Sequence, residues 1–146
     1  MKETTTPNRR LFLDDGTVIN QYSHILEGAE IGEEVMIGEH CFVGGKAKIG
    51  DRSRVQNGNN IWDGVEIGKG VFIGPNCTLT NHHDPRERKT RKTFIPDKTI
   101  IKDDATISAG VTIVAPCTIG VNALVGAGST VLRDVKDYEV VSGVVK

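Results

Sequence analysis

A branched apolar residue recurs at every sixth position along most of the chain. From Ile19 each step of six lands on Ile, Val or Leu as far as Leu79, and a second run extends from Ile95 to Val131. The residue four places after each is mostly small or β-branched, and glycine often follows the apolar residue directly. A helical period of 3.6 residues would lose this register within a few steps. The pattern instead predicts a parallel β-helix, in which each six-residue repeat forms a short strand with its branched residue pointing inward.

Three such repeats make one triangular coil, so residues 18 positions apart are expected to stack. The spacing between Leu79 and Ile95 is 16 residues, which predicts a loop of about residues 85–94, "PRERKTRKTF", pushed out of an intact coil. The fold class is therefore all-β, with a single domain over residues 1–146. Because the end coils of a stacked protein need covering, residues 1–18 and 137–146 are predicted to be the N-terminal and C-terminal caps.

The composition excludes several functional classes. The chain has 18 Lys and Arg residues against 19 Asp and Glu residues, so no net field attracts it to nucleic acid or to an anionic membrane. It contains no apolar run of membrane-spanning length and no signal-peptide core, which favours a cytoplasmic location. Cys41, Cys77 and Cys117 all fall at the small inward position, which predicts buried fillers rather than metal ligands or nucleophiles.

The rhythm is broken at "TNHHDPR", which gathers groups that bind protons and anions. His82 and His83 are the candidate bases, since imidazole has a suitable intrinsic pKa. The register predicts that His83 points inward and His82 outward. Asp63 and Asn81 are 18 residues apart and are expected to stack on adjacent coils.

The repeats, from about Ile19 to Val141, resemble the left-handed β-helix acyltransferase superfamily, which implies a left-handed coil. The resemblance also implies a homotrimer that binds acetyl-CoA in the groove between subunits. "QNGNNIWDGVEI" and "TNHHDPR" resemble segments of N-acetyltransferases that modify nucleotide-linked 3-amino sugars, and residues 104–135 resemble their CoA-binding coils. One difference is the C-terminal "VVSGVVK", which replaces the usual Gly-Asn-Pro-Ala and basic residue that shape the coenzyme end of that groove.

This resemblance implies roles for individual residues. It places Asn81 at the acceptor amine and Asp63 beside the sugar, with Trp62 and Arg86 as further substrate contacts, and it leaves His82 and His83 open as catalytic bases or plain contacts. The residues implied for coenzyme binding are Ala109, Gly110, Ala127, Gly128 and Arg133. Backbone N–H groups near the first two would bind the thioester oxygen.

The basic run after Pro85 has two interpretations. Its five cations are Arg86, Arg88, Lys89, Arg91 and Lys92. They either keep a protruding loop soluble or contact the diphosphate of a nucleotide sugar or the phosphates of CoA. The second interpretation is slightly favoured, with Arg86 as its best candidate.

Together these features predict an acetyl-CoA-dependent N-acetyltransferase that acts on the amine of a nucleotide-activated amino sugar, for surface polysaccharide biosynthesis. The alternatives are an O-acetyltransferase of the same superfamily and a non-catalytic β-helix scaffold. A zinc hydratase like the β-helix carbonic anhydrases is disfavoured, because adjacent side chains such as His82 and His83 point opposite ways on a strand. No metal is therefore expected.

Overall fold

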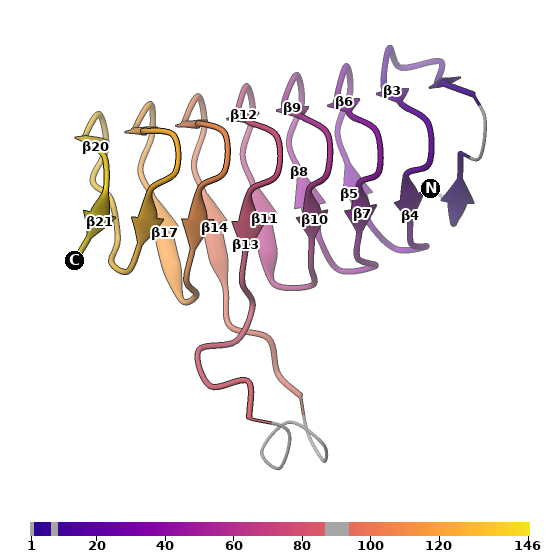
Figure 1. Ribbon diagram of the computed structural model, residues 1–146. Helices are drawn as coiled ribbons and strands as arrows, with labels where there is room; N and C mark the ends of the chain where they lie inside the picture. The colour runs from indigo at the N-terminus through magenta and orange to yellow at the C-terminus, as the bar shows by residue number, and fades with distance from the viewer. Residues whose placement is uncertain (1, 7–8, 87–93) are drawn as a thin grey trace.

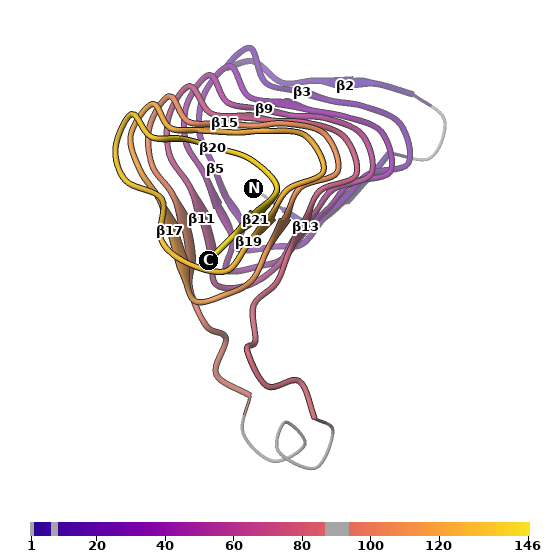
Figure 2. The same cartoon turned by 60° about the vertical axis from the view of Figure 1, so that its left-hand side comes forward.

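The protein folds as a parallel β-helix with one long excursion from its side (Figures 1 and 2). The computed structural model describes residues 2–6, 9–86 and 94–146. The two ends of the chain lie at opposite ends of the stack (Figure 1). In the described residues, no helix is long and apolar enough to cross a membrane.

Three sheets form the three sides of the coil, here called faces A, B and C. The eight strands of face A are β1 Thr4–Thr5, β4 His24–Ile25, β7 Phe42–Val43, β10 Asn60–Ile61, β13 Thr78–Leu79, β16 Thr112–Ile113, β19 Thr130–Val131 and β21 Val144–Val145. The eight strands of face B are β2 Leu11–Phe12, β3 Val18–Ile19, β6 Met36–Ile37, β9 Arg54–Val55, β12 Phe72–Ile73, β15 Thr106–Ile107, β18 Leu124–Val125 and β20 Val140–Val141. The five strands of face C are β5 Glu30–Ile31, β8 Lys48–Ile49, β11 Val65–Ile67, β14 Thr99–Ile101 and β17 Cys117–Ile119. Only β1 and β2, at the N-terminal end, pair antiparallel with their neighbours among these strands.

The core is a column of branched side chains, as the six-residue period predicts. The inward residues from Ile19 to Leu79 and from Ile101 to Val131 are buried, apart from Ile31, which is half-buried. The small residues four places later are buried as well, and the three cysteines are confirmed as buried, unpaired fillers. Burial raises the pKa of their thiols, that of Cys117 to about 11, so they stay protonated near neutral pH.

Polar side chains that face the interior all bind the backbone of a neighbouring coil. Ser53 Oγ donates to Gly68 O at 2.7 Å and accepts from Val71 N at 3.1 Å. Asn59 Nδ2 donates to Gly74 O at 2.9 Å. Within the described residues, no buried side-chain nitrogen or oxygen lacks a hydrogen-bond partner. These groups therefore fix the stacking of the coils without an unpaired polar atom.

The excursion leaves the coil between β13 and β14 and returns to it (Figure 1). The protruding loop is confirmed, but it is wider than residues 85–94. Leu79 and Ile101 are successive inward residues and lie 22 positions apart instead of 6, so 16 residues are inserted. The prediction that Ile95 points inward is wrong, because its side chain is 76% exposed on the returning limb. The cations predicted at positions 88, 89, 91 and 92 lie outside the described residues.

An arginine holds the C-terminal end of the stack together. Arg133 Nη2 and Nη1 donate to the Glu139 carboxylate at 2.8 and 3.2 Å, and Nη1 also donates to Asp134 O at 2.7 Å. Its Nε donates to Lys146 O at 3.0 Å. The guanidinium hydrogen bonds lower the pKa of Glu139 to about 2. Arg133 therefore joins the turn after β19 to the end of β21.

Replacing a core residue should destabilise the stack strongly. Ile107 is fully buried on β15, and we expect Ile107→Ala to lower the free energy of unfolding by about 2–5 kcal/mol through lost transfer energy and a residual cavity. Thr106→Ala changes the outward neighbour on the same strand and should shift it by less than about 0.5 kcal/mol. Denaturant unfolding of both variants measures the difference. Equal losses would contradict the assignment of the inward face.

The Arg133–Glu139 pair should make stability depend on acidic pH. Because the folded-state pKa of Glu139 is about 2 against an ordinary value of 4.5, ionised Glu139 stabilises the fold above pH 4.5, and this contribution is lost as pH falls toward 2. We expect Glu139→Gln to have a lower Tm than the wild type near pH 6, with the gap closing near pH 2. Glu33→Gln, which removes a carboxylate without an ion pair in the described chain, is the matched control. A Tm gap that does not change with pH would refute the assignment.

Candidate functional site

A groove of about 210 Å³ lies at the corner between faces A and C, where the excursion begins. Its lining residues are Leu26, Phe42, Gly44, Trp62, Asp63, Asn81 and Phe94. The whole chain has only seven Phe, Trp and Tyr residues, and three of them line this groove. The rings of Phe42 and Trp62 lie 5.2 Å apart between their centroids. The groove is therefore mainly apolar, with one carboxylate and one amide at its edge.

Glycine creates the space for this groove. Leu26, Gly44 and Trp62 occupy the same corner position in three successive coils, 18 residues apart. A Cβ atom on Gly44 would lie 2.5 Å from Asp63 Oδ1 and 2.9 Å from Asp63 N, which is too close for any side chain. The missing side chain leaves a gap between the leucine and the tryptophan.

Asn81 and Asp63 stack on adjacent coils, as their spacing predicts. Asn81 Nδ2 donates to Asp63 O at 3.0 Å, and no donor to Asn81 Oδ1 is found in the described part of the chain. Asp63 Oδ1 accepts from Lys46 N at 2.9 Å, so one carboxylate oxygen holds the turn of the preceding coil. The same kind of bond is made by Asp51, Asn57 and Asp103. Only Oδ2 of Asp63 is left for a substrate, and its predicted substrate contact stays a prediction.

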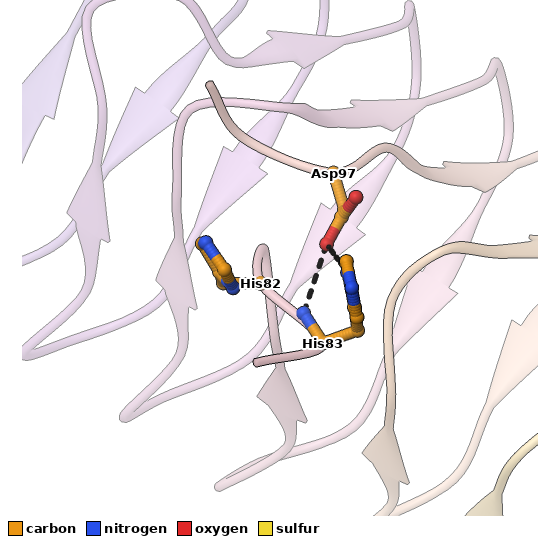
Figure 3. Close-up of side chains that lie close together, drawn as sticks. All are labelled: His82, His83 and Asp97. Atoms are coloured by element: carbon orange, nitrogen blue, oxygen red, sulfur yellow. Dashed lines mark hydrogen bonds and ion pairs between the residues drawn. The ribbon is translucent and has the colours of Figure 1, made fainter. Parts of the chain in front are cut away.

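The structure overturns the prediction that His83 points inward. The chain has already left the coil at this point, and the His83 side chain is 65% exposed. Asp97 Oδ2, on the returning limb, accepts from His83 N at 2.8 Å and lies 2.7 Å from His83 Nδ1 (Figure 3). These bonds lower the pKa of Asp97. The sequence reasoning missed Asp97, because no repeat position marks it.

His82 has a different environment from its neighbour. Its ring is half-buried and stacks on Phe94, with centroids 5.5 Å apart and an interplanar angle of 18°. His82 Nδ1 accepts a hydrogen bond from Asp84 N at 2.9 Å. His82 is therefore tied to the groove through Phe94, whereas His83 is held by Asp97.

His82, His83 and Asp97 are close enough to be considered as metal ligands. One ligand atom from each lies within 4.8 Å of the other two. However, His82 Nδ1 already receives the Asp84 N–H, and Asp97 Oδ2 already accepts from His83. A metal ion would have to displace these hydrogen bonds, so the trio does not favour one. The expectation that no metal is needed stays a prediction.

Arg86 lies beyond the groove and is paired within its own segment. Its Nε and Nη2 donate to the two oxygens of Asp84 at 2.6 and 2.7 Å, which raises the pKa of Arg86. The side chain remains largely exposed. Its predicted contact with substrate is a prediction that this arrangement does not test.

The residues predicted for coenzyme binding separate into two places. Ala109, Gly110, Ala127 and Gly128 lie at the corner between faces A and B, in two successive coils. Arg133 lies at the corner between faces A and C, beyond Asn81, and its guanidinium is occupied by Glu139. Face A therefore separates Arg133 from the other four.

The backbone N–H groups of Ala109 and Ala127, at the corner between faces A and B, have no acceptor within the described residues. Gly110 N donates to Pro75 O at 3.0 Å, so that N–H is not available for a ligand. In an earlier coil, Asn57 Oδ1 accepts from Glu39 N at this corner. Ala127 lies one coil beyond Ala109 and, unlike Asn57, has no side-chain oxygen that could accept from the preceding coil. Within the described residues, neither Ala109 N nor Ala127 N has an acceptor. The absence of Asx residues from these two coils is the sequence signal for this pair of donors.

Comparison with known proteins supports this fold. Residues 13–45 and 46–81 match the family described as bacterial transferase hexapeptide (six repeats). No curated protein matches the chain.

Three solved structures illustrate the similarity. Perosamine N-acetyltransferase from Caulobacter crescentus, in complex with CoA and GDP-perosamine, has a TM-score of 0.74 and 20% identity over 87% of this chain and 54% of its own. The acetyltransferase domain of PglB from Neisseria gonorrhoeae FA1090, with acetyl coenzyme A, has a TM-score of 0.72 and 18% identity over 88% and 55%. A hexapeptide-repeat acetyltransferase from Vibrio cholerae, with acetyl coenzyme A, has a TM-score of 0.60 and 26% identity over 80% and 66%. The chain spans about half the length of the first two.

The left-handed β-helix that the sequence predicted is thus confirmed by both the repeat and the fold. Residues 13–81 therefore match hexapeptide repeats, and the chain as a whole has the fold of these solved acetyltransferases.

Proposed function

We propose that this protein transfers an acetyl group from acetyl-CoA to the amine of a nucleotide-linked amino sugar. The observation that carries the proposal is the stacked pair of Asn81 and Asp63 at the edge of an aromatic groove. Asn81 Oδ1 and Asp63 Oδ2 are acceptors with no protein donor within the described residues, and an amine or a sugar hydroxyl supplies the donors that they lack. A general scaffold has no need for such a pair beside three aromatic rings.

The groove accounts for binding and orientation of the acceptor. The flat apolar faces of Trp62, Phe42 and Phe94 suit the apolar face of a sugar ring or a nucleobase. Asn81 Oδ1 accepts an N–H of the neutral amine and directs its lone pair at the thioester carbon. Asp63 Oδ2 accepts from a neighbouring hydroxyl. This positioning supplies catalysis by holding the nucleophile in the geometry of attack.

The unused N–H groups of Ala109 and Ala127 suit the coenzyme. Backbone donors of this kind bind amide or thioester carbonyl oxygens, and they cost no reorganisation when charge develops on the oxygen. Solved relatives of this fold contain CoA or acetyl coenzyme A. In the proposed reaction the amine nitrogen bonds to the acetyl carbon, the carbon–sulfur bond breaks, and one proton leaves the nitrogen.

A homotrimer is part of the proposal, for a geometric reason. The acceptor groove lies at the corner between faces A and C, whereas the free N–H groups lie at the corner between faces A and B. Within one chain face A stands between them. A neighbouring subunit would bring its own A–B corner to the groove and complete the site. The predicted cytoplasmic location and the role in surface polysaccharide biosynthesis remain proposals of the same kind.

A screen of thiol release from acetyl-CoA tests the proposed function directly. We expect turnover with nucleotide-linked amino sugars and none with the corresponding sugars that carry a hydroxyl in place of the amine. Asn81→Ala should lower kcat by about 100-fold, because a misplaced amine loses the geometry of attack. His82→Gln should cost less, since its ring contacts Phe94 instead of the amine. A larger loss in His82→Gln would reverse these roles, and turnover of hydroxyl acceptors would identify an O-acetyltransferase.

Acetyl-CoA should stabilise the folded protein. A ligand that binds only the folded state stabilises it by about 2.7 kcal/mol at 100 times its Kd. We expect the Tm to rise with acetyl-CoA concentration in a thermal-shift experiment, and to rise less with adenosine alone because it lacks the pantetheine amides. A Tm that does not respond to acetyl-CoA would favour the non-catalytic scaffold.

A further inference from the structure

We propose that Cys77 is a positioning residue, whose buried thiol holds the Ser108–Ala109 peptide so that the Ala109 N–H points at the thioester oxygen of acetyl-CoA. This rests on the proposed function, because that function assigns the Ala109 N–H to the coenzyme. Cys77 lies on the inner side of the corner between faces A and B and is 5% exposed. Its role is to orient a donor, so the thiol itself contacts neither the substrate nor the coenzyme.

The thiol of Cys77 binds the carbonyl end of this peptide from the inside of the coil. Cys77 Sγ donates to Ser108 O at 3.1 Å and lies 3.3 Å from Gly74 O, its second acceptor. Burial raises the pKa of the thiol, so it keeps the proton that it donates near neutral pH. A planar trans peptide points its N–H away from its C=O. Because Ser108 O is directed at the buried thiol, the Ala109 N–H is directed to the exposed side of the corner.

The same peptide is also held on its other sides. Ser108 N donates to Val125 O at 3.0 Å in the following coil. Gly74 packs against the peptide from the preceding coil, where a Cβ atom would lie 2.6 Å from Ala109 N and 2.7 Å from Ser108 C. The direction of the Ala109 N–H is therefore fixed before a ligand arrives, and such a donor costs no reorganisation when charge develops on an oxygen.

In an earlier coil the equivalent corner peptide, Gly38–Glu39, is bound at both ends. Ser23 Oγ donates to Gly38 O at 2.7 Å from the preceding coil, and Glu39 N donates to Asn57 Oδ1 at 2.8 Å in the following coil. Ser23 and Cys77 occupy the same inward column, so each binds the carbonyl of a corner peptide in the following coil. The Asn57 oxygen shows where an acceptor for the N–H of such a peptide lies.

The Ser108–Ala109 peptide keeps the bond to its carbonyl and lacks the acceptor for its N–H. The position that corresponds to Asn57 is Ala127, 18 residues beyond Ala109, and it has no side-chain oxygen. The space beside the donor is open, since a Cβ atom on Gly110 would have no heavy atom within 4 Å apart from its chain neighbours. A ligand oxygen can therefore occupy the place of the missing asparagine oxygen.

The N–H of Asn57 provides a useful contrast. It also has no acceptor within the described residues, and the carbonyl of its peptide, Gln56 O, accepts from Cys41 Sγ at 3.2 Å. However, Asn76 Oδ1 fills the space that a Cβ atom on Gly58 would need, so this corner is filled by protein atoms. Cys41 therefore makes the same kind of bond at a corner without the open space that a ligand needs.

Kinetics of cysteine variants test the proposal. We expect Cys77→Ala to lower kcat by about 10-fold with little change in the KM for acetyl-CoA, because a misdirected donor loses part of the roughly 100-fold contribution of an oxyanion-binding group. Cys77→Ser keeps a donor and should restore kcat to within about 3-fold of the wild type. Cys41→Ala is the matched control, and should lower the Tm by a similar amount while leaving kcat unchanged. A loss of Tm without a loss of kcat in Cys77→Ala, or equal kcat losses in the two alanine variants, would overturn the proposal.

Hydrogen exchange of the Ala109 amide, measured by NMR, separates this proposal from the proposed function. In the wild type we expect this amide to exchange rapidly, because it has no acceptor, and acetyl-CoA should slow the exchange by about 10-fold or more. Slow exchange without a ligand would overturn the proposal, and so would unaltered exchange at an acetyl-CoA concentration that raises the Tm. If acetyl-CoA neither raises the Tm nor supports turnover with any acceptor, the proposed function fails, and the role of Cys77 fails with it.

A variant that restores the missing acceptor keeps the test valid if the alanine variant does not fold. A Cβ atom on Gly38 would lie 2.5 Å from Asn57 Oδ1, so an asparagine acceptor needs glycine at the position that Ser108 occupies. We therefore combine Ser108→Gly with Ala127→Asn. Relative to Ser108→Gly alone, this double variant should slow the exchange of the Ala109 amide without a ligand, and lower kcat/KM for acetyl-CoA by about 10-fold or more because the donor is occupied.

The corner between faces B and C offers the matched control for the double variant. Asp103 Oδ1 accepts from Lys69 N there, whereas Asp103 N has no acceptor in the described part of the chain. Lys102 and Val121 occupy the positions that correspond to the glycine and the asparagine. Lys102→Gly with Val121→Asn should therefore leave kcat/KM unchanged. An unchanged kcat/KM in the first double variant, with its amide protected from exchange, would overturn the proposal.

Discussion

Hydrogen bonds between the backbones of successive coils fix the positions of all other groups in this protein. Gly38 N donates to Val55 O at 2.7 Å, and Gly74 N donates to Ile107 O in the same way at 2.7 Å. A coil whose backbone is bonded to neighbours on both sides cannot take in extra residues without leaving those groups unpaired. The 16 inserted residues therefore leave the stack altogether, and the following coil continues in register on β11.

The same constraint turns sequence spacing into columns of side chains. Equivalent corner positions of successive coils stack on one another and form a column of side chains. A different residue type at one position of the column therefore changes the surface of that coil only. Gly44 between Leu26 and Trp62 opens a groove in one column. Asn81 above Asp63 places an amide over a carboxylate in the next. The groove, the acidic group and the amide lie together because the register allows no other arrangement.

Side-chain positions within the stacked coils could be predicted from the sequence, because the six-residue register determines them. The predictions failed for residues of the excursion, where this register does not apply. The inward series, the buried cysteines and the Asp63–Asn81 stack follow from spacing alone. Ile95 was wrongly placed because a later isoleucine, Ile101, also fits the six-residue step, and counting residues cannot show which of the two rejoins the stack. His83 was wrongly placed because the count was continued past the point where the chain leaves the coil. Asp97 has no periodic neighbour and could be found only from the folded loop.

The hydrogen-bonding groups assigned to ligands in the proposed function lie at corners of the coil. In the regular coils, aspartate and asparagine side chains such as Asp51 and Asn57 bind the preceding turn, and the backbone donors there are used. In the column of Asn57, Ala127 has no side-chain oxygen that could accept from Ala109 N, which has no acceptor in the described residues. Asn81 stands at the last corner position before the excursion, and its oxygen has no donor in the described residues. The side-chain acceptors of the proposed site, unlike the buried polar side chains, are not all used by the backbone of a neighbouring coil. The proposed acceptor site thus lies where the six-residue repeat of the sequence is interrupted, which is the signal that the sequence offers for its position.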